Sequence, residues 1–355
     1  MRRISLFVAV FITCLIFLSL ILFNNSAFAQ VTIARLSDFK GEVVLEREGR
    51  PVPLELNMPI VAKDRIKVEE GMAEIEYDDG SILNIRPDTD LILDQIKKKR
   101  KILGLWSRTY LSRLINIFKG KVSGIIKERK DLVTEFETPT LVAAVRGTTV
   151  SIGFNPDTGQ AELRTDAGEV LAFSPDGWQT FILSTGESVA VYWDSETGST
   201  SIATLSGTVD VTSGNTTTTV ETGDAISANV NPDTGAASVT AIAGTVEVTA
   251  GDMTITVETG DAIAANVDPD TGVASIFVTA GEVEVTSGGV TTTVSEGLGT
   301  WAAPGEAPGT PAEVLPEEAP LVEAPEPYMP PDVPEVEVPM EEEPPVEDIE
   351  PASPA

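Results

Sequence analysis

Several residue types on which enzymes rely are missing from this chain. It contains no histidine, and its single cysteine, Cys14, lies in an apolar run near the N-terminus. Outside that run, disulfides, zinc sites built on cysteine or histidine, cysteine nucleophiles and Ser-His-Asp triads are therefore excluded. A glycoside hydrolase built on two carboxylates is the enzyme class that this composition still allows. Because the acids lie mostly in turns and at alternating strand positions, we expect no enzyme and no catalytic, cofactor-binding or metal-binding residues.

Positive charge is missing from the second half of the chain. All 24 Lys and Arg lie within residues 1–164, together with 21 of the 55 Asp and Glu. Residues 165–355 carry the other 34 acids and no Lys or Arg, so their net charge is −34 against +3 for the first part. Such a region repels nucleic acid and anionic membranes and attracts basic partners. We therefore expect no nucleic-acid partner.

Residues 1–29 have the organisation of an export signal. Arg2 and Arg3 precede the apolar run Leu6–Phe23, and Ala27-Phe28-Ala29 offers small residues for cleavage before Gln30. We expect an exported protein, in the periplasm or at the cell surface. An uncleaved anchor is the alternative, because a run of eighteen residues is just long enough to span a bilayer. Membrane contact and a membrane-anchored signalling role are expected only in that case.

Residues 30–173 have the pattern of a β-domain. Ala73–Tyr77 alternates apolar and acidic residues, as a half-exposed strand does. Asp78-Asp79-Gly80 is a strong hairpin signal, and Ser81–Arg86 is the expected return strand.

Residues 97–130 form a basic insertion in this domain, with twelve Lys and Arg and a single acid. Leu111, Leu114, Ile115 and Phe118 have helical spacing. Three interpretations stay open: an insertion packed through its apolar side, an amphipathic element that contacts a membrane or an acidic partner, and an element that docks on the chain's own acidic half. The densest run of charge is the expected interaction patch, which consists of Lys97, Lys98, Lys99, Arg100 and Lys101.

The most specific motif of the chain lies between residues 138 and 152. Thr138-Pro139 predicts an extended entry, because the residue before a proline avoids the α region. Leu141–Val150 predicts a buried strand that one arginine, Arg146, interrupts. A carboxylate or backbone carbonyls should pair with this arginine, because a buried unpaired charge is costly. The motif residues are expected to be structural and are Thr138, Pro139, Val145, Arg146, Gly147 and Thr148.

This signature occurs together with Gly41-Glu-Val-Val-Leu, Asp79-Gly80-Ser81 and Gly168-Glu-Val-Leu-Ala, and the set resembles the FecR domain family. The resemblance covers roughly residues 31–173. It implies an all-β, extracytoplasmic domain, which in founding members is the periplasmic part of a regulator that relays a receptor's state to a sigma factor. Only five residues precede the apolar run. We therefore expect the fold and the exported location to carry over, and the relay not to.

From residue 168 onward the sequence repeats. Gly207-Thr-Val, Gly244-Thr-Val and Gly281-Glu-Val begin units that are 37 residues apart. Strands with one apolar face predict stacked β-hairpins over residues 168–302, in a solenoid-like or sandwich-like arrangement, because a single unit cannot bury that face alone.

Four aspartates of the repeats suggest two interpretations. Asp224 and Asp261 follow glycines, and Asp233 and Asp270 stand in Pro-Asp-Thr-Gly. Such residues are typical of turns. Calcium binding is the alternative, although neither an EF-hand nor a nonapeptide repeat is present.

Residues 303–355 are rich in Pro, Glu and Ala and contain no Lys or Arg, which predicts a disordered acidic tail. The tail is expected to be a spacer or a ligand for a basic surface, including the basic insertion of the same chain. The sequence thus predicts an all-β, non-enzymatic, exported module that binds, senses or scaffolds in the cell envelope. Its partner would be an envelope protein or a glycan. A structural or adhesive surface repeat protein is the alternative.

Overall fold

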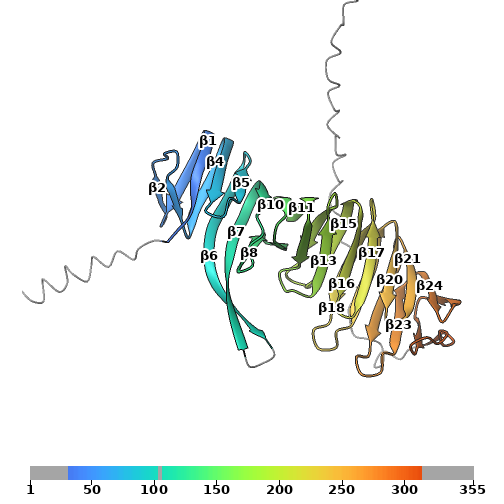
Figure 1. The fold of residues 1–355 in the computed structure, drawn as a ribbon. Coiled ribbons are helices and arrows are strands. Elements are labelled where there is room, and N and C mark those ends of the chain that lie inside the picture. Colours follow the sequence, from blue (N-terminus) through green and yellow to red (C-terminus); the bar gives the residue numbers. More distant parts are fainter. Residues whose placement is uncertain (1–30, 103–105, 314–355) are drawn as a thin grey trace, which may run out of the picture.

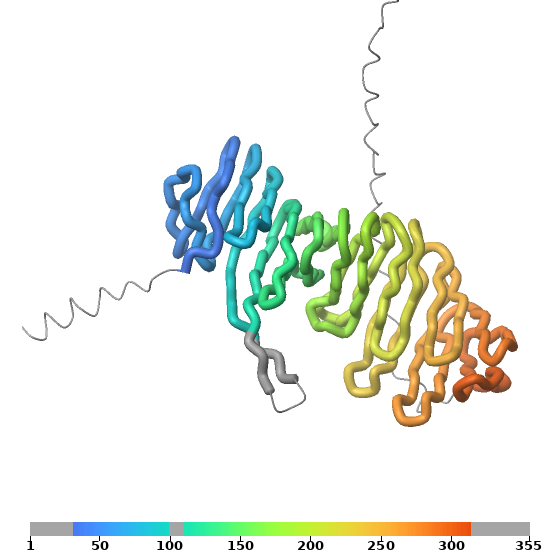
Figure 2. Tube along the Cα trace, viewed as in Figure 1, coloured from blue at the N-terminus to red at the C-terminus, as the bar shows by residue number. Residues whose placement is uncertain are grey.

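The computed structural model describes residues 31–102 and 106–313, which form an elongated molecule built from β-strands (Figures 1 and 2). Within these ranges no helix is long and apolar enough to cross a membrane. The prediction of an all-β fold with stacked hairpins is confirmed. The predicted export signal and residues 314–355 of the predicted tail lie outside the described residues.

The first seven strands form an N-terminal sheet. β1 pairs with β4 along nearly its whole length, β4 pairs with β5 and β6, and these two strands pair with β7. The Asp78–Gly80 turn joins β4 to β5, as the sequence predicted. The bounds of these strands are β1 Thr32–Arg47, β2 Arg50–Val52, β3 Pro59–Val61, β4 Asp64–Tyr77, β5 Ile82–Ile85, β6 Thr89–Ile102 and β7 Trp106–Ile125.

Two glycines face each other in the middle of the β1–β4 pair. Gly41 and Gly71 are register partners and have positive φ angles of 83° and 93°. A Cβ on Gly41 would lie 2.2 Å from the carbonyl oxygen of Glu70. Because no side chain fits into that gap, glycine is required for both strands to bend at this point and to stay paired on either side.

Beyond the core, β6 and β7 stay paired over residues 94–102 and 106–114, and we call this extension the arm (Figure 1). The helix indicated by the spacing of apolar residues between Leu111 and Phe118 does not form, because these residues lie in β7. Apolar residues at consecutive positions, such as Leu114 and Ile115, occur in a strand that has contacts on both faces, and this pattern imitates helical spacing. The basic insertion is thus an extension of the sheet.

β7 connects the N-terminal sheet to the rest of the molecule. Its residues 111–116 pair with β8 in parallel, and its residues 120–125 pair with β10. In the part of the chain that the structure describes, no other strand pairs with both regions. β8 and β10 each begin one of two layers, so β7 is the point from which both layers grow.

The layers consist of antiparallel hairpins that alternate along the chain. Layer A contains β10 Thr149–Asn155, β11 Gln160–Ala167, β14 Ser188–Trp193, β15 Thr200–Ser206, β18 Ala225–Val230, β19 Ala237–Ala243, β22 Ala262–Val267, β23 Ala274–Ala280, β26 Leu298–Ala302 and β27 Ala312–Glu313. Layer B contains β8 Leu132–Glu137, β9 Val142–Val145, β12 Glu169–Phe173, β13 Gln179–Ser184, β16 Thr208–Ser213, β17 Thr216–Glu221, β20 Thr245–Ala250, β21 Met253–Glu258, β24 Glu282–Ser287 and β25 Val290–Ser295.

Each complete 37-residue unit adds one hairpin to each layer. Within a layer, every hairpin pairs with the hairpins before and after it. The inward-facing side chains of both layers join the N-terminal sheet in a single hydrophobic core. The sandwich-like arrangement is therefore the one that forms. Because the alternation begins with β10, before residue 168, the repeats and the predicted FecR-like region share the same layers.

The structured chain extends beyond residue 302, after which the tail was predicted to begin. β27 pairs with β26, and the Ser287 hydroxyl donates to the carbonyl oxygen of Glu306 at 2.6 Å. The Thr300 hydroxyl donates to the carbonyl oxygen of Gly309 at 2.7 Å. Residues 303–313 thus contact β24 of layer B and β26 of layer A, and their assignment to a disordered tail is wrong.

Candidate functional site

The signature motif is the place where the chain crosses from layer B to layer A. The prediction of one buried strand over Leu141–Val150 is wrong, because β9 ends at Val145 in layer B and β10 begins at Thr149 in layer A. Gly147, with a φ of 67°, makes the crossing. The Thr138 hydroxyl oxygen accepts from the Leu141 amide at 3.0 Å and closes the turn before β9.

Arg146 is exposed on this crossing rather than buried in a strand. Its Nη2 donates to the carbonyl oxygen of Lys130 at 3.1 Å, so the predicted backbone carbonyl partner is present. The Thr148 hydroxyl donates to the carbonyl oxygen of Glu169 at 3.0 Å, while Val145 is buried and Pro139 is exposed. The contacts of the motif residues are those of a structural link between layers.

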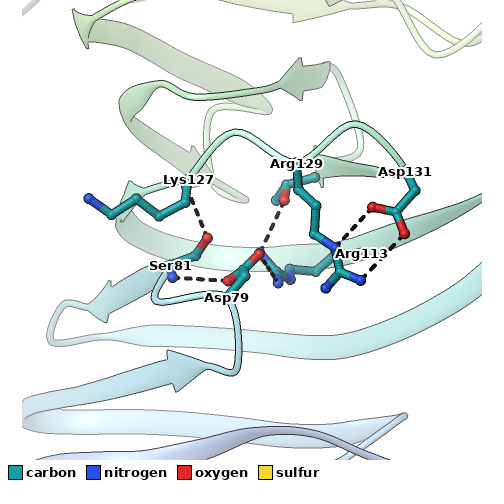
Figure 3. Close-up of polar contacts among 7 residues, drawn as sticks. Asp79, Ser81, Arg113, Lys127, Arg129 and Asp131 are labelled. Atoms are coloured by element: carbon teal, nitrogen blue, oxygen red, sulfur yellow. Dashed lines mark hydrogen bonds and ion pairs between the residues drawn. The ribbon is translucent and has the colours of Figure 1, made fainter.

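A buried charge network lies where the β4–β5 turn meets β7 (Figure 3). Arg113 donates from Nη2 to Asp79 Oδ2 at 2.9 Å and from Nη1 to the Thr134 hydroxyl at 3.3 Å. Its guanidinium carbon lies 3.6 Å from the centroid of the Tyr77 ring. The side chains of Arg113 and Asp79 are only 4% and 8% exposed, so the pair is largely removed from water.

The network ties the β4–β5 turn to the segment after β7. Asp79 accepts from the Ser81 amide at 2.9 Å, and the Ser81 hydroxyl oxygen accepts from the Lys127 amide at 3.0 Å (Figure 3). Burial alone would raise the pKa of Asp79, but the Ser81 amide and Arg113 hold that pKa below its ordinary value of 3.8. Burial raises the pKa of Tyr77 to about 12. Near neutral pH the aspartate therefore stays ionised and the phenol stays neutral. The charges of the network do not change in this pH range, so its role is structural.

Sequence reasoning found the turn of this network but missed Arg113. The signal available was Arg113 itself, the single charged residue of the mainly apolar run Leu111–Ile117. A charge in such a run requires a partner, although the sequence does not say which carboxylate provides it.

The predicted basic patch is divided between the two faces of the arm. Lys97 is exposed, whereas the neighbouring Lys98 forms an ion pair with Glu135 of layer B. Successive residues of a strand point to opposite faces, so the two lysines cannot act on one surface. The side chains of Lys99, Arg100 and Lys101 lie outside the described part of the chain.

The outer face of layer B carries a continuous row of threonines. Register pairs join one threonine from each of seven neighbouring strands, and none of the seven is buried. In order across the layer they are Thr180, Thr212, Thr217, Thr249, Thr254, Thr286 and Thr291. The hydroxyls of Thr286 and Thr291 lie 2.8 Å apart. The row presents hydroxyl groups at the spacing of neighbouring strands, roughly 4.8 Å.

Beside this row, acids and threonines alternate from strand to strand. In order across the layer these residues are Asp210, Thr219, Glu247, Thr256, Glu284 and Thr293. A hollow at the β13 end of the face also exposes two apolar side chains, Leu171 and Ile182. Since no Lys or Arg occurs after Arg164, this face attracts cationic groups and can both donate and accept hydrogen bonds.

The repeated turn motifs hold the hairpins closed. The Thr222 hydroxyl accepts from the Gly207 amide at 2.8 Å and donates to the Gly207 carbonyl at 3.0 Å. We call this contact the threonine clasp; Thr259 donates in the same way to the Gly244 carbonyl at 2.9 Å.

The four aspartates considered for calcium occupy positions in or beside such turns. The carboxylates of Asp224 and Asp261 lie against Gly244 and Gly281, and Asp233 and Asp270 lie in exposed turns. Among the described residues, no group of three or more His, Cys, Asp or Glu could hold a metal ion.

Comparisons with known proteins give only distant likenesses. No family model matches the chain, and no curated protein matches it. A candidate anti-sigma factor from Parabacteroides distasonis ATCC 8503 is similar at 14% identity and a TM-score of 0.28, over 36% of this chain and 54% of that one. This chain thus spans about half the length of that structure.

The TCP10 domain of Danio rerio CPAP, solved with a peptide of Danio rerio STIL, is similar at 12% identity and a TM-score of 0.13, over 70% of this chain and 97% of that one. At such TM-scores neither likeness establishes a shared fold. Function is therefore inferred from the chain's own residues.

Proposed function

We propose that this protein is a non-catalytic, exported module of the cell envelope that binds a partner through the outer face of layer B. The row of seven threonines carries the proposal. A sandwich core constrains only the inward positions of a strand, so the outward positions are free to differ. Threonine occupies the same outward position on seven neighbouring strands. This regularity favours a surface that binds a partner with evenly spaced contact groups.

The partner is an envelope protein with a basic surface. The alternating row provides carboxylates without any neighbouring Lys or Arg, which favours positive charge and disfavours nucleic acid or an anionic membrane. The hollow that contains Leu171 and Ile182 provides apolar contact beside this charge. Membership of the FecR domain family and export through residues 1–29 belong to the proposal, and they are supported by the sequence motifs alone.

A capture experiment with the full chain tests this function. We compare the wild type with the triple variant Asp210→Asn, Glu247→Gln and Glu284→Gln in envelope extracts. The control variant Asp157→Asn, Glu196→Gln and Asp233→Asn removes the same charge from exposed turns. We expect the first variant to capture at least fivefold less of the partner protein than the wild type does. The control variant should capture as much as the wild type.

Equal capture by the two variants would exclude the layer B face. Capture that survives digestion of the extract with protease would identify a glycan as the partner instead.

A structural surface protein is the second candidate, favoured by the elongated, repeat-built shape (Figure 2). In that role the repeats are a stalk and the tail is a spacer. Protease accessibility on intact cells separates the two candidates, because a surface stalk is cleaved from outside and a periplasmic module is protected.

A further inference from the structure

From β14 to β23 the outer face of layer A carries no charged residue, in contrast to the outer face of layer B. None of the strands β14, β15, β18, β19, β22 and β23 contains a charged residue, whereas β16, β17, β20, β21 and β24 each contain an acid. The outward positions of the layer A strands hold mainly Ser, Thr, Ala and Asn, with two aromatic side chains, Tyr192 and Phe277.

Part of this outward face is buried. Ser227 is 1% exposed, and Ser238 and Ala264 are 0% exposed, although their neighbours in the strands point into the core. These residues adjoin one another, because Ser238 is the register partner of Ala264, and Thr240 is the register partner of Ser227. Residues on the outside of a sandwich become buried only when something lies over them.

The same patch contains polar atoms without partners. The hydroxyls of Ser238, Thr240 and Thr279 and the amide oxygen of Asn266 are buried and have no hydrogen-bond partner among the described residues. Buried polar groups in folded proteins are normally paired. The three hydroxyl groups lack an acceptor, which the backbone carbonyls of a covering segment would supply, and the Asn266 amide oxygen lacks a donor, which a backbone N–H of that segment would supply.

The chain itself provides a segment at the right place. The described structure ends at Glu313 in β27, which pairs with β26 at the end of layer A, and residues 314–355 follow. Six strand steps separate β26 from β14, which is roughly 29 Å at the usual strand spacing. About ten residues in polyproline II conformation cover that distance.

The sequence of this segment fits an uncharged face. Polyproline II has three residues per turn. One face of residues 314–328 would then be wholly apolar, consisting of Pro316, Ala319, Val322, Pro325 and Tyr328. Glu317, Glu323 and Glu326 would share another face. Proline-rich backbone lacks many N–H donors but keeps its carbonyl acceptors, as the free hydroxyls require.

We propose that residues 314–328 dock along the outer face of layer A, from β26 towards β14. The apolar face of the segment lies on the patch that contains Ala264, and its carbonyl oxygens accept hydrogen bonds from Ser238 and Thr240. The acidic face points to solvent. The acids of layer B would repel this segment, so of the two layers layer A is the one that can bind it.

Cysteine pairs in the full chain test the docking. In a Cys14→Ser background we combine Pro316→Cys with Ala264→Cys, because Ala264 in β22 lies two strand steps, roughly 10 Å, from β26 and about three residues in polyproline II conformation cover that distance; as controls we combine Pro316→Cys with Thr249→Cys on layer B or Lys97→Cys on the arm. We expect rapid disulfide formation within one chain for the Ala264→Cys pair and at least tenfold slower formation for both controls. Faster reaction with Lys97→Cys would place the segment on the basic arm, and a disulfide-linked dimer would place it on a second copy; either result overturns the proposal.

A second measurement does not depend on engineered cysteines. Ala264→Trp fills the proposed binding patch, and we compare it with the wild type by digestion with a protease that cuts after glutamate. We expect cleavage at Glu317 and Glu323 to accelerate at least fivefold in the variant, with an unchanged β-sheet circular dichroism spectrum. Equal cleavage rates in two folded proteins would overturn the proposal.

Discussion

The N-terminal sheet and the repeat layers are held together in different ways. The N-terminal sheet depends on contacts that occur only once. Examples are the buried ion pair of Arg113 with Asp79 and the close approach of Gly41 to Gly71. In the layers, the threonine clasp recurs from unit to unit. Stability is thus concentrated in the first region and distributed in the second, as in other repeat proteins. Single substitutions should therefore have large effects in the first region and small, additive effects in the second.

The largest effect is expected from Asp79→Ala. The substitution leaves the guanidinium of Arg113 buried without its carboxylate, and breaking a buried pair in this way typically costs about 3–5 kcal/mol of unfolding free energy. Urea denaturation followed by circular dichroism measures the loss. Asp78→Ala is the matched control, because Asp78 is the exposed neighbour in the same turn. Equal stabilities of the two variants would show that the network is not decisive.

Gly41→Ala should rank second. The added methyl group meets the Glu70 carbonyl at 2.2 Å and also forces an L residue to keep a positive φ. Such strain costs about 2–3 kcal/mol. Gly49→Ala is the control, since Gly49 has a φ of 73° but open space around its Cβ position, and about 1–2 kcal/mol is expected there. The difference between the urea midpoints of the two variants measures the effect of the close approach of β1 and β4 at Gly41. Identical midpoints would show that this close approach contributes no strain.

Thr222→Val should have a smaller effect, because it removes one threonine clasp and keeps the β-branched shape. The clasp of Thr222 consists of two hydrogen bonds, and their joint loss is worth about 1–2 kcal/mol. Adding Thr259→Val in the next unit should add the loss that Thr259→Val causes on its own, since distant sites in a repeat array act independently. Thr254→Val, on the outer face of layer B, is the control. A double variant far less stable than the sum of its parts would show that the layers behave like the N-terminal sheet.

The smallest effect is expected from Glu137→Gln, and it should depend on pH. Burial raises the pKa of Glu137 above its ordinary 4.5, Glu135 raises it further, and Lys98 partly offsets both. The ionised form is therefore disfavoured in the folded protein, so stability falls as pH rises from 4.5 through the raised value. The variant should melt at a higher temperature than the wild type at pH 7 and at the same temperature at pH 3. A lower melting temperature at pH 7 would contradict this.

Much of the fold could be predicted because its signals are local. Alternation over Ala73–Tyr77 and Thr208–Thr212 identifies strands, and Asp79-Gly80 identifies a hairpin, from neighbouring residues alone. The 37-residue period follows from repeated glycines and needs no knowledge of packing. These features were predicted correctly because each depends on residues close together in the chain.

The remaining features depend on residues far apart. The pairing of Arg113 with Asp79 joins positions 34 residues apart, and no local pattern selects one acid among many. The crossing at Gly147 was hidden because apolar residues occur on both sides of it, in strands of different layers. The sequence of β7 imitates a helix because β7 has contacts on both faces. Its apolar and polar residues therefore do not alternate as they do in a half-exposed strand. The docking face of layer A is likewise absent from any local pattern.

The way in which the repeats stack also determines how far the molecule reaches. A complete unit contributes two strands to each layer, which lengthens the sandwich by roughly 10 Å. Each added hairpin offers the next hairpin the same edge for pairing. The contacts of the final strands with residues 303–313 therefore do not depend on the number of units before them. A gain or loss of one unit would change the separation between the arm and the far end in fixed steps, while the core and both ends stay the same.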